Sequence, residues 1–263
     1  MLTVKEVYEA IDAFAPFASQ ESWDNSGLLV GGMAQPADRI LTTLDISEAI
    51  VAQAVAEQVQ LVVAHHPVIF SPLKTLPPDS PVYQLAAHGI AAICVHTPLD
   101  MAPLGLNTFA HTLLEKPLAL QGTQEVLEPS WTDGRGFGWI DTSARTWTPQ
   151  TLAQTLQTAF GEVRYSAAER SIRKIAYCSG SAASMLELAA AKGCDALITG
   201  DIKHDRWYAA EFAGIALFDC GHYGTERFAG ILAEQIRKAL PVAQVTENAG
   251  RNPAEFCRGV EKA

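Results

Sequence analysis

The chain has 263 residues, of which 48% are hydrophobic and 18% are charged, so it has enough apolar side chains for a core and is not a disordered polypeptide. Its 19 basic residues are outnumbered by 29 acidic residues, which gives a formal net charge of −10. This charge repels phosphate backbones, so we do not expect a nucleic acid partner. No apolar run approaches the roughly 18 residues of a membrane span, and no leader sequence is evident, so we expect a cytoplasmic protein without a membrane partner.

Short apolar runs alternate with helix-like segments in the first part of the chain. Strands are predicted at residues 40–44, 61–64 and 90–95, and helices at residues 47–59, 81–88 and 106–114. Ser47 is suited to an N-cap and Pro81 to the first turn of a helix. Strands without polar alternation, separated by helices, indicate a sheet that is covered on both faces.

The segment from residue 118 to residue 140 differs, because its turn residues and short apolar pieces predict irregular and antiparallel structure. Gly134, Gly136 and Gly138 lack the preceding strand and the following helix of a dinucleotide-binding turn, so we interpret them as a glycine-rich strand or bulge. The sequence contains no GxxxxGK[ST] loop, which excludes a P-loop nucleotide enzyme.

The alternation of strands and helices then resumes. Strands are predicted at residues 172–178, 196–199 and 215–218, and helices at residues 148–160, 181–192, 204–212 and 223–240. The whole pattern predicts an α/β protein with two α/β lobes, whose mostly parallel sheets are covered by helices.

The five cysteines do not form a metal-binding or disulfide pattern. They are Cys94, Cys178, Cys194, Cys220 and Cys257. Their number is odd and no CxxC pair occurs, so we expect reduced thiols, several of them buried, rather than a zinc site.

Five of the seven histidines follow predicted strands, where parallel α/β sheets place their reactive groups. They are His65, His66, His96, His204 and His222. The other two, His88 and His111, fall on predicted helices, and we expect them to face solvent.

Two pairs of residues have the spacing of metal ligands. Pro67 ends the strand before it, so that His65 and His66 can point toward two different ions. His222 and Glu226 share one face of a predicted helix, where an imidazole and a carboxylate can bind one ion and the carboxylate can bridge two. A surface ion pair is the alternative for His222 and Glu226 taken alone.

Asp100 also follows a predicted strand, where it is either a loop acid or a helix cap. Three histidines and two carboxylates at three strand ends supply the nitrogen and oxygen ligands of divalent transition metals. These five groups are too many for one ordinary site and suit two ions that share a bridging water or hydroxide. Zn, Mn, Fe, Co and Ni all accept this ligand set, so two divalent ions of unspecified identity are the expected cofactors.

Five segments resemble, in the same order, motifs of the Nif-three-like family, whose members are also called dinuclear-metal-centre hexameric proteins or GTP cyclohydrolase I type 2 homologues. They are WDNSGLLVG at 23–31, AHHP at 64–67, HTPLD at 96–100, TGD at 199–201 and GHYGTER at 221–227. The resemblance extends from about residue 1 to Pro253, and the residues after Pro253 look like a short extension.

The resemblance implies the roles of individual residues. In that family two metals are held by residues matching His65, His66, Asp100, His222 and Glu226. Glu226 would bridge the ions, His65 and Asp100 would serve one ion, and His66 would serve the other. His96 matches a histidine that lies behind the ligands or faces the substrate, where it orients a ligand or moves a proton.

The resemblance also implies two interlinked lobes and a toroidal homohexamer with the sites facing an inner cavity. Under that reading residues 1–117 form the first lobe with His65, His66 and Asp100, residues 118–214 form the second lobe, and residues 215–263 return to the first lobe with His222 and Glu226.

Two functions from different classes fit these features. The first is a metal-dependent hydrolase that attacks a nucleotide-like or phosphorylated small molecule with a metal-bridging hydroxide, with His96 as the catalytic proton shuttle. Only the family name points to GTP as the substrate. The alternative is a non-enzymatic hexameric metal-binding scaffold, chaperone or regulatory interaction protein.

Several residues near the motifs keep two interpretations. Trp23, Asp24 and Asn25 either line a pocket beside the metals or form a turn packed by Trp23. Asp45 either supports a metal ligand or joins a helix-capping network with Ser47. Asp201 and His204 follow a strand, from which they could reach the cavity.

Overall fold

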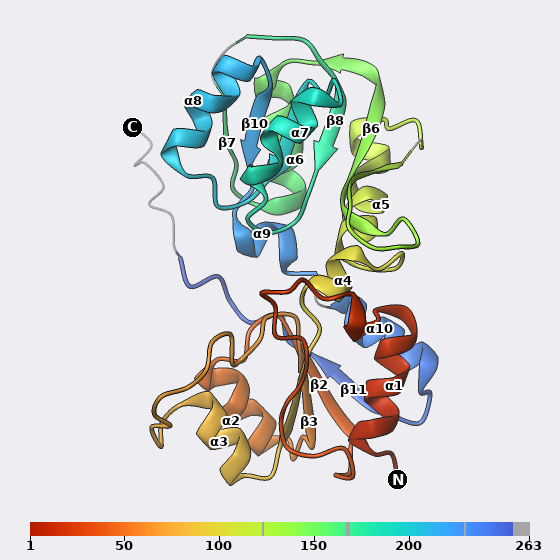
Figure 1. The fold of residues 1–263 in the computed structure, drawn as a ribbon, viewed down its shortest axis with the longest axis vertical. Helices are drawn as coiled ribbons and strands as arrows, with labels where there is room; N and C mark the ends of the chain where they lie inside the picture. The colour runs from red at the N-terminus through yellow and green to blue at the C-terminus, as the bar shows by residue number, and fades with distance from the viewer. Residues whose placement is uncertain (123, 167–168, 229, 255–263) are drawn as a thin grey trace, which may run out of the picture.

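The protein consists of two lobes, each built on one sheet with helices on both faces, as the computed structural model in Figure 1 shows. The structure describes residues 1–122, 124–166, 169–228 and 230–254. No helix within these ranges is long and apolar enough to cross a membrane.

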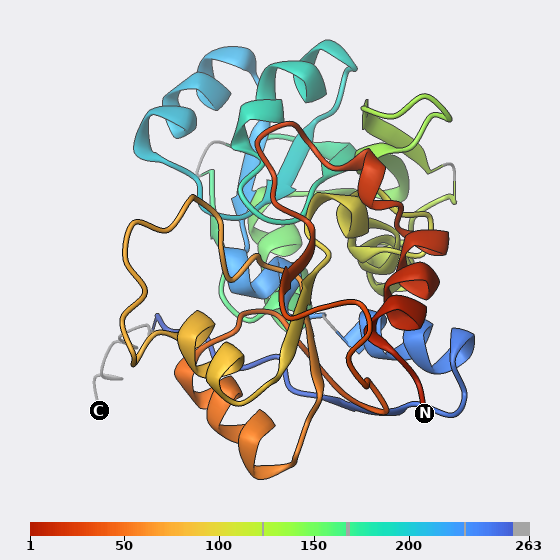
Figure 2. The ribbon, with the colours of Figure 1, turned by 60° about the horizontal axis from the view of Figure 1, so that its bottom comes forward.

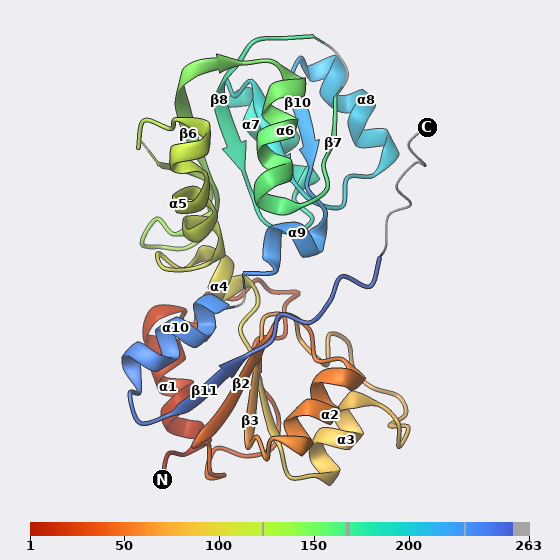
Figure 3. The same ribbon diagram turned by 180° about the vertical axis from the view of Figure 1, so that it is seen from behind.

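The first lobe contains a five-stranded sheet in the order β1-β4-β3-β2-β11. Its strands are β1 (Gly27–Val30), β2 (Arg39–Thr43), β3 (Leu61–Ala64), β4 (Ala91–Cys94) and β11 (Gln244–Glu247). All neighbouring strands are parallel except β1 and β4. The helices α1 (Val4–Phe14) and α10 (Gly230–Ala239) cover one face, and α2 (Glu48–Ala56) and α3 (Pro81–Ala87) cover the other (Figure 3).

The composition of β3 explains this double covering. All four of its residues are buried, and successive side chains point to opposite faces of the sheet. Leu61 and Val63 join the core under α1 and α10, whereas Val62 and Ala64 join the core under α2 and α3. The predicted N-cap is confirmed, because the Ser47 side chain accepts a hydrogen bond from the Ile50 backbone at the start of α2.

The second lobe contains a six-stranded sheet in the order β5-β6-β8-β9-β10-β7. Its strands are β5 (Glu125–Pro129), β6 (Gly136–Trp147), β7 (Arg164–Tyr165), β8 (Ile172–Tyr177), β9 (Ala196–Thr199) and β10 (Ala216–Asp219). The helices α5 (Leu106–Leu118) and α6 (Pro149–Phe160) pack on one face, and α7 (Leu186–Ala191) and α8 (His204–Ala213) pack on the other.

The prediction of mostly parallel sheets is wrong for the second lobe. Among its described strands, β9 runs parallel to β8 and to β10. The pairings β5–β6, β6–β8 and β7–β10 are antiparallel, so both lobes contain mixed sheets. The irregular and antiparallel structure expected for residues 118–140 is present as β5 and the start of β6, which contains Gly136 and Gly138.

Two boundaries differ from those expected. Strand β10 pairs with β9 and β7, so the chain returns to the first sheet after this strand rather than at residue 215. The single helix predicted over residues 223–240 is instead α9 (His222–Glu226) and α10. One straight helix could not both hold Glu226 between the lobes and pack Leu232 and Ile236 on the first sheet.

Three further differences are local. Residues 181–192, expected as one helix, form a short 3-10 helix η2 (Ala183–Met185) followed by α7. Helix α1, strand β1 and the short helix η1 (Phe17–Ser19) were not predicted. Cys94, Cys178, Cys194 and Cys220 are buried free thiols, as expected, and Cys257 lies outside the described residues.

The two short helices α4 (Thr97–Met101) and α9 lie where the lobes meet (Figure 1). Helix α4 follows β4 of the first sheet, and α9 follows β10 of the second sheet. The junction therefore gathers the ends of strands from both lobes.

Candidate metal centre

The junction brings together side chains that are up to 161 positions apart in the sequence, from His65 to Glu226. His65 and His66 follow β3, His96 follows β4, and Asp100 lies on α4. His222 and Glu226 lie on α9. Their nitrogen and oxygen atoms form groups in which every ligand atom lies within 4.8 Å of the others.

One group, which we call the inner triplet, consists of His65, Asp100 and Glu226. His65 Nε2 lies 3.9 Å from Asp100 Oδ1 and 3.8 Å from Glu226 Oε1. All three residues are buried. The inner triplet thus places one imidazole and two carboxylates around a position closed off from solvent.

A second group, the outer triplet, consists of His66, His222 and Glu226. His66 Nε2 and His222 Nε2 each lie 2.8 Å from Glu226 Oε2. The two imidazole nitrogens lie 3.2 Å from each other. Because Glu226 offers Oε1 to the inner triplet and Oε2 to the outer triplet, its carboxylate joins the two groups.

These residues fit a pair of divalent metal ions. His65 Nε2 is buried and has no hydrogen-bond partner among the described residues, although buried polar atoms are rarely left unpaired. His66 Nε2 and His222 Nε2 also face each other beside Glu226 Oε2, an arrangement that a cation would stabilise. Imidazole and carboxylate donors are those that divalent transition metals accept.

Hydrogen bonds on the opposite side of each imidazole orient the ligand atoms. His65 Nδ1 lies 2.9 Å from the carbonyl oxygen of Val95, which can only accept a hydrogen bond. His66 Nδ1 lies 2.7 Å from Asp45, and His222 Nδ1 lies 2.8 Å from Asp201. Each Nδ1 therefore carries a proton, so that Nε2 is the nitrogen that would bind a metal once it has lost its own proton.

The supporting roles of two aspartates answer questions that the sequence left open. Asp45 contacts a histidine of the outer triplet, which is the first of its two interpretations, and Asp201 also reaches the site. His204 does not, because its ring packs on Tyr208 at the exposed start of α8.

The second lobe supplies supports that sequence reasoning missed. Ser179 Oγ donates to Asp100 Oδ1 at 2.9 Å. Gly180 has a φ of +64°, and a Cβ there would lie 2.3 Å from Glu226 Oε1, so only glycine leaves room for this carboxylate. Both residues follow β8. Because α/β sheets carry reactive groups at the carboxyl ends of their strands, this position could have been predicted.

Burial and pairing shift the pKa values of the ligands. The hydrogen bond to Glu226 raises the pKa of His222 to about 9. Burial lowers the pKa of His66, but its bonds to Asp45 and Glu226 outweigh this and raise the pKa to about 10. Burial also opposes ionisation of Glu226, yet the hydrogen bonds from the histidines hold its pKa well below the usual range. Without metal the outer triplet thus favours charged imidazoles around a carboxylate.

His96 lies beside both triplets without belonging to either. Its ring centroid is 5.3 Å from that of His65 and 5.7 Å from that of His66. Its Nδ1 lies 2.9 Å from Asp24, whose pKa is held well below its usual range by hydrogen bonds from His96 and Thr97, which outweigh the effect of burial. His96 also forms a third group with His65 and His66, in which one nitrogen of each ring lies within 4.8 Å of the others. Because Asp24 binds Nδ1 of His96, Nε2 is its nitrogen without that partner.

The segment Trp23–Asn25 forms a turn, the second of its two interpretations, and it contacts His96 although none of its three residues lines a described cavity. Asp24 accepts hydrogen bonds from the backbone and side chain of Thr97 and so ties the turn to α4. Trp23 is 56% exposed and packs edge-on against His96 at 5.8 Å. Asn25 donates to the carbonyl oxygen of Ile69 in the loop after β3.

His111, which was expected to face solvent, is instead buried. Its Nε2 lies 2.9 Å from Asp141 Oδ2 in the core of the second lobe, and its ring packs edge-on against Trp139. The paired carboxylate compensates for burial of the imidazole. His88 is exposed, as expected.

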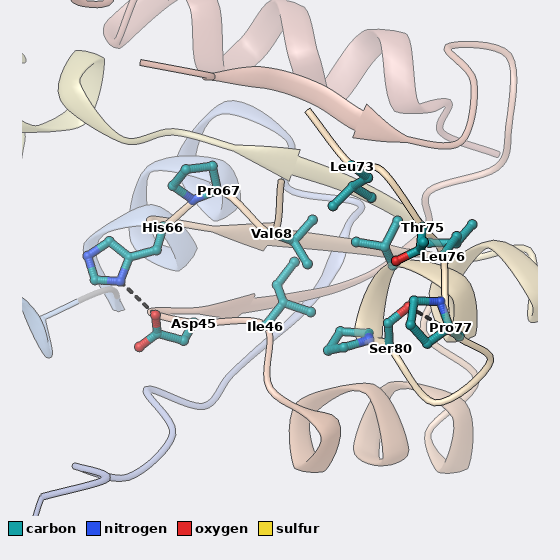
Figure 4. A pocket seen from close by; sticks show the side chains of 12 residues that line it. Asp45, Ile46, His66, Pro67, Val68, Leu73, Thr75, Leu76, Pro77 and Ser80 are labelled. Atoms are coloured by element: carbon teal, nitrogen blue, oxygen red, sulfur yellow. Dashed lines mark hydrogen bonds and ion pairs between the residues drawn. The ribbon is translucent and has the colours of Figure 1, made fainter. Parts of the chain in front are cut away.

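Two cavities meet at His66 and Asp45. The large cavity, of about 1350 Å³, extends over the outer triplet, and its walls include Asp201, His222, Arg164 and Arg227. The small pocket, of about 330 Å³, lies on the other side of the Asp45–His66 pair, between the loop after β3 and the start of α3 (Figure 4). A molecule at the outer triplet can thus extend in two directions.

Comparisons with known proteins agree with this architecture. The family model for Duf34/NIF3 (NGG1p interacting factor 3) matches residues 2–251. A Helicobacter pylori protein named GTP cyclohydrolase 1 type 2 is 35% identical over 263 residues, which span 97% of this chain and 100% of the relative. A Campylobacter jejuni GTP cyclohydrolase 1 type 2 homolog is 29% identical over 262 residues, with the same coverage.

Solved structures share the fold. A Staphylococcus aureus hypothetical protein superposes with a TM-score of 0.84 at 22% identity, covering 97% of this chain and 99% of that one. A Bacillus cereus protein related to NIF3 gives a TM-score of 0.84 at 18% identity, with the same coverage. Both comparisons extend over both lobes, so the two-lobed arrangement is common to these proteins.

Proposed function

Because this chain belongs to the Duf34/NIF3 family, we propose that it is a metal-dependent hydrolase that binds two divalent ions at the lobe junction. His65, Asp100 and Glu226 would hold one ion, and His66, His222 and Glu226 would hold the other. The observation that carries the proposal is the division of the Glu226 carboxylate between the two triplets. A carboxylate whose two oxygens face two ligand groups can serve two adjacent ions at once.

The ions would supply Lewis acidity and an activated water near neutral pH. The chain's own residues would do the rest. Asp45 and Asp201 hold His66 and His222 in one orientation, as carboxylates behind metal-binding histidines do. His96, held by Asp24 at Nδ1, lies beside the histidine pair, where its Nε2 would accept a proton from the nucleophile or donate one to the leaving group.

The substrate class we propose is a nucleotide-like or phosphorylated small molecule. The large cavity beside the outer triplet has room for such a ligand. Arg227 in its wall would attract an anionic group, whereas the guanidinium of Arg164 is paired with Asp219. The name of the Helicobacter pylori relative makes GTP the first compound to test. For that compound the reaction would open the imidazole ring of guanine and release formate.

The test begins with metal content, measured by elemental analysis of untagged protein purified without chelator. The proposal predicts about two ions per chain and loss of both in Glu226→Gln, which keeps the shape of the side chain but removes its charge. Metal-loaded protein should then release formate from GTP or phosphate from related compounds. Less than half an ion per chain after reloading with Zn or Mn would refute the dinuclear centre.

The same centre also suits the alternative function, because the family description includes an interacting factor. A non-enzymatic metal-binding scaffold would lose metal in Glu226→Gln but turn over no substrate in either form. We also propose a ring-shaped homohexamer, which light scattering would detect as a particle of six chains. A change of oligomeric state in the variant, without any measurable turnover in the parent, would favour the scaffold.

A further inference from the structure

The small pocket next to the outer triplet differs in chemistry from the large cavity. Of the residues around it, Asp45 and His66 stand at one end, and Thr75 and Ser80 are the other polar ones. The remaining walls are apolar and include Ile46, Val68, Leu73, Leu76 and Val82. In Figure 4, Ile46, Val68, Leu73 and Leu76 lie to one side of the Asp45–His66 pair.

Ser80, one of the two polar side chains deeper in the pocket, offers little to a ligand. Ser80 Oγ donates to the carbonyl oxygen of Pro77 at 2.7 Å and accepts from the backbone of Tyr83 at 3.3 Å, where it caps α3. A ring with many hydrogen-bonding atoms would lose its bonds to water here and find few partners. The pocket is therefore suited to an alkyl or aryl group rather than to a polar heterocycle.

One wall of the pocket is a loop whose hydrogen bonds to the rest of the described chain lie near its two ends. Asn25 binds the carbonyl oxygen of Ile69 at one end, and Gln84 binds that of Pro78 at the other. Every residue from 70 to 79 between these anchors is exposed, including Leu73 at 51% and Leu76 at 47%. Figure 2 shows this segment, between β3 and α3, standing away from the first lobe. An apolar group in the pocket would cover these exposed side chains.

The small pocket opens beside the outer triplet, so a group bound in the pocket can belong to a molecule that is bound at the triplet. Asp45 and His66 line both the small pocket and the large cavity, so the outer triplet lies at the opening between them. We propose that the small pocket binds an alkyl or aryl group of the substrate, while the polar part of the same molecule lies at the metal ions and in the large cavity. This inference rests on the proposed metal centre, and it narrows the substrate to molecules that join an apolar group to a polar or anionic one. GTP has no alkyl or aryl group for the small pocket, so the inference favours other phosphorylated compounds over GTP.

The first test does not depend on metal. In protein with labelled methyl groups, n-hexanol should shift the signals of Ile46, Leu76 and Val82 saturably, and the signal of Leu104 should stay unchanged. Leu104 is a suitable control because it is 55% exposed but lines neither cavity. Absence of saturable shifts at the three pocket residues would overturn the proposal.

The second test links the pocket to the metal centre through hydroxamates, which bind divalent ions through two oxygens. In metal-loaded protein, affinity should rise by about threefold to fourfold per methylene from acetohydroxamate to hexanohydroxamate, as expected for burying each group. The double variant Leu73→Ser/Leu76→Ser should flatten this rise but bind acetohydroxamate normally. The variant Leu104→Ser should behave like the parent protein.

The outcomes separate this inference from the proposed function. Equal affinity for all chain lengths would overturn the inference and leave the metal centre intact. Binding of hexanol together with hydroxamate affinities that are the same with and without metal would instead refute the metal centre as the anchor and retain the pocket as an apolar ligand site. If the double variant changed the oligomeric state, a second copy of the chain would be the occupant, and the proposal would be wrong.

Discussion

The inner and outer triplets share one carboxylate but differ in how the fold holds them. The side chains of the inner triplet are at most 10% exposed, whereas those of His66 and His222 are 21% and 36% exposed. A backbone carbonyl orients His65, but carboxylates that are themselves more than half exposed orient His66 and His222.

This difference indicates a division of labour between two ions. The inner position depends on strand ends that are packed into both cores, so an ion there should exchange slowly. The outer position depends on surface aspartates at the edge of the large cavity, so an ion there should exchange readily and meet the substrate. Variants that act on one triplet or on both can test this comparison.

The largest effect is expected from Gly180→Ala, which adds a methyl group 2.3 Å from Glu226 Oε1. Displacement of this carboxylate should empty both triplets, although Gly180 binds no metal itself. Gly193→Ala is the matched control, because Gly193 has a similar φ of +71° and open space around it. The control should cost about 1–2 kcal/mol of stability but keep both ions. Normal metal content in Gly180→Ala would show that Glu226 can move without losing either site.

Next in size is the separation of the two positions by single substitutions. Asp100→Asn should remove the inner ion and His222→Ala the outer ion, which leaves about one ion per chain in each variant. A chelator should then strip the ion left in Asp100→Asn faster than the ion left in His222→Ala. Time courses of metal release measure this directly. Equal release rates would contradict the distinction between a closed and an open position.

A smaller effect is expected from Asp45→Asn, which changes a support rather than a ligand. Loss of the charged partner behind His66 should weaken the outer ion by about 10-fold to 100-fold and leave the inner ion in place. Asp205→Asn, at an exposed position in the first turn of α8, is the control. Metal titration by calorimetry distinguishes the two variants. If Asp45→Asn weakened both ions equally, His66 would not belong to the outer position alone.

The parts of the centre that could be predicted are those set by local sequence. His65 and His66 end a strand before Pro67, and His222 and Glu226 lie one helical turn apart, so spacing alone indicated which residues to consider. The division of Glu226 between two triplets could not be derived that way, because it depends on how α9 sits against both sheets.

The errors arose where tertiary packing overrides local pattern. Most of residues 223–240 are helical, as the pattern predicts. They form two separate helices, however, because α9 lies at the lobe junction and α10 packs on the first sheet. His111 lies on a helix as expected, yet its partner Asp141 is 30 positions away on β6, which no helical spacing reveals. Ser179 and Gly180 escaped notice because small residues carry no metal-binding signal of their own.

A separate prediction concerns the metal-free protein and its stability as the pH changes. Folding raises the pKa of His66 to about 10 and that of His222 to about 9, from an ordinary value of 6.5. A group whose pKa is raised by folding stabilises the folded state while it is protonated. That stabilisation is complete below about pH 6.5 and is lost as the pH rises through 9 to 10. The melting temperature of metal-free protein should therefore fall over this interval.

The contribution of the outer triplet to that fall can be isolated with two variants. His66→Gln should flatten the pH dependence, because it removes one of the two histidines responsible. His204→Gln, at the exposed start of α8, should retain the slope of the parent protein. Saturating metal should also flatten the curve, since bound ions displace the protons from the imidazoles and hold them off across the whole range. A slope that persisted unchanged in His66→Gln would mean that other groups set the pH dependence and that His66 is not charged in the metal-free protein.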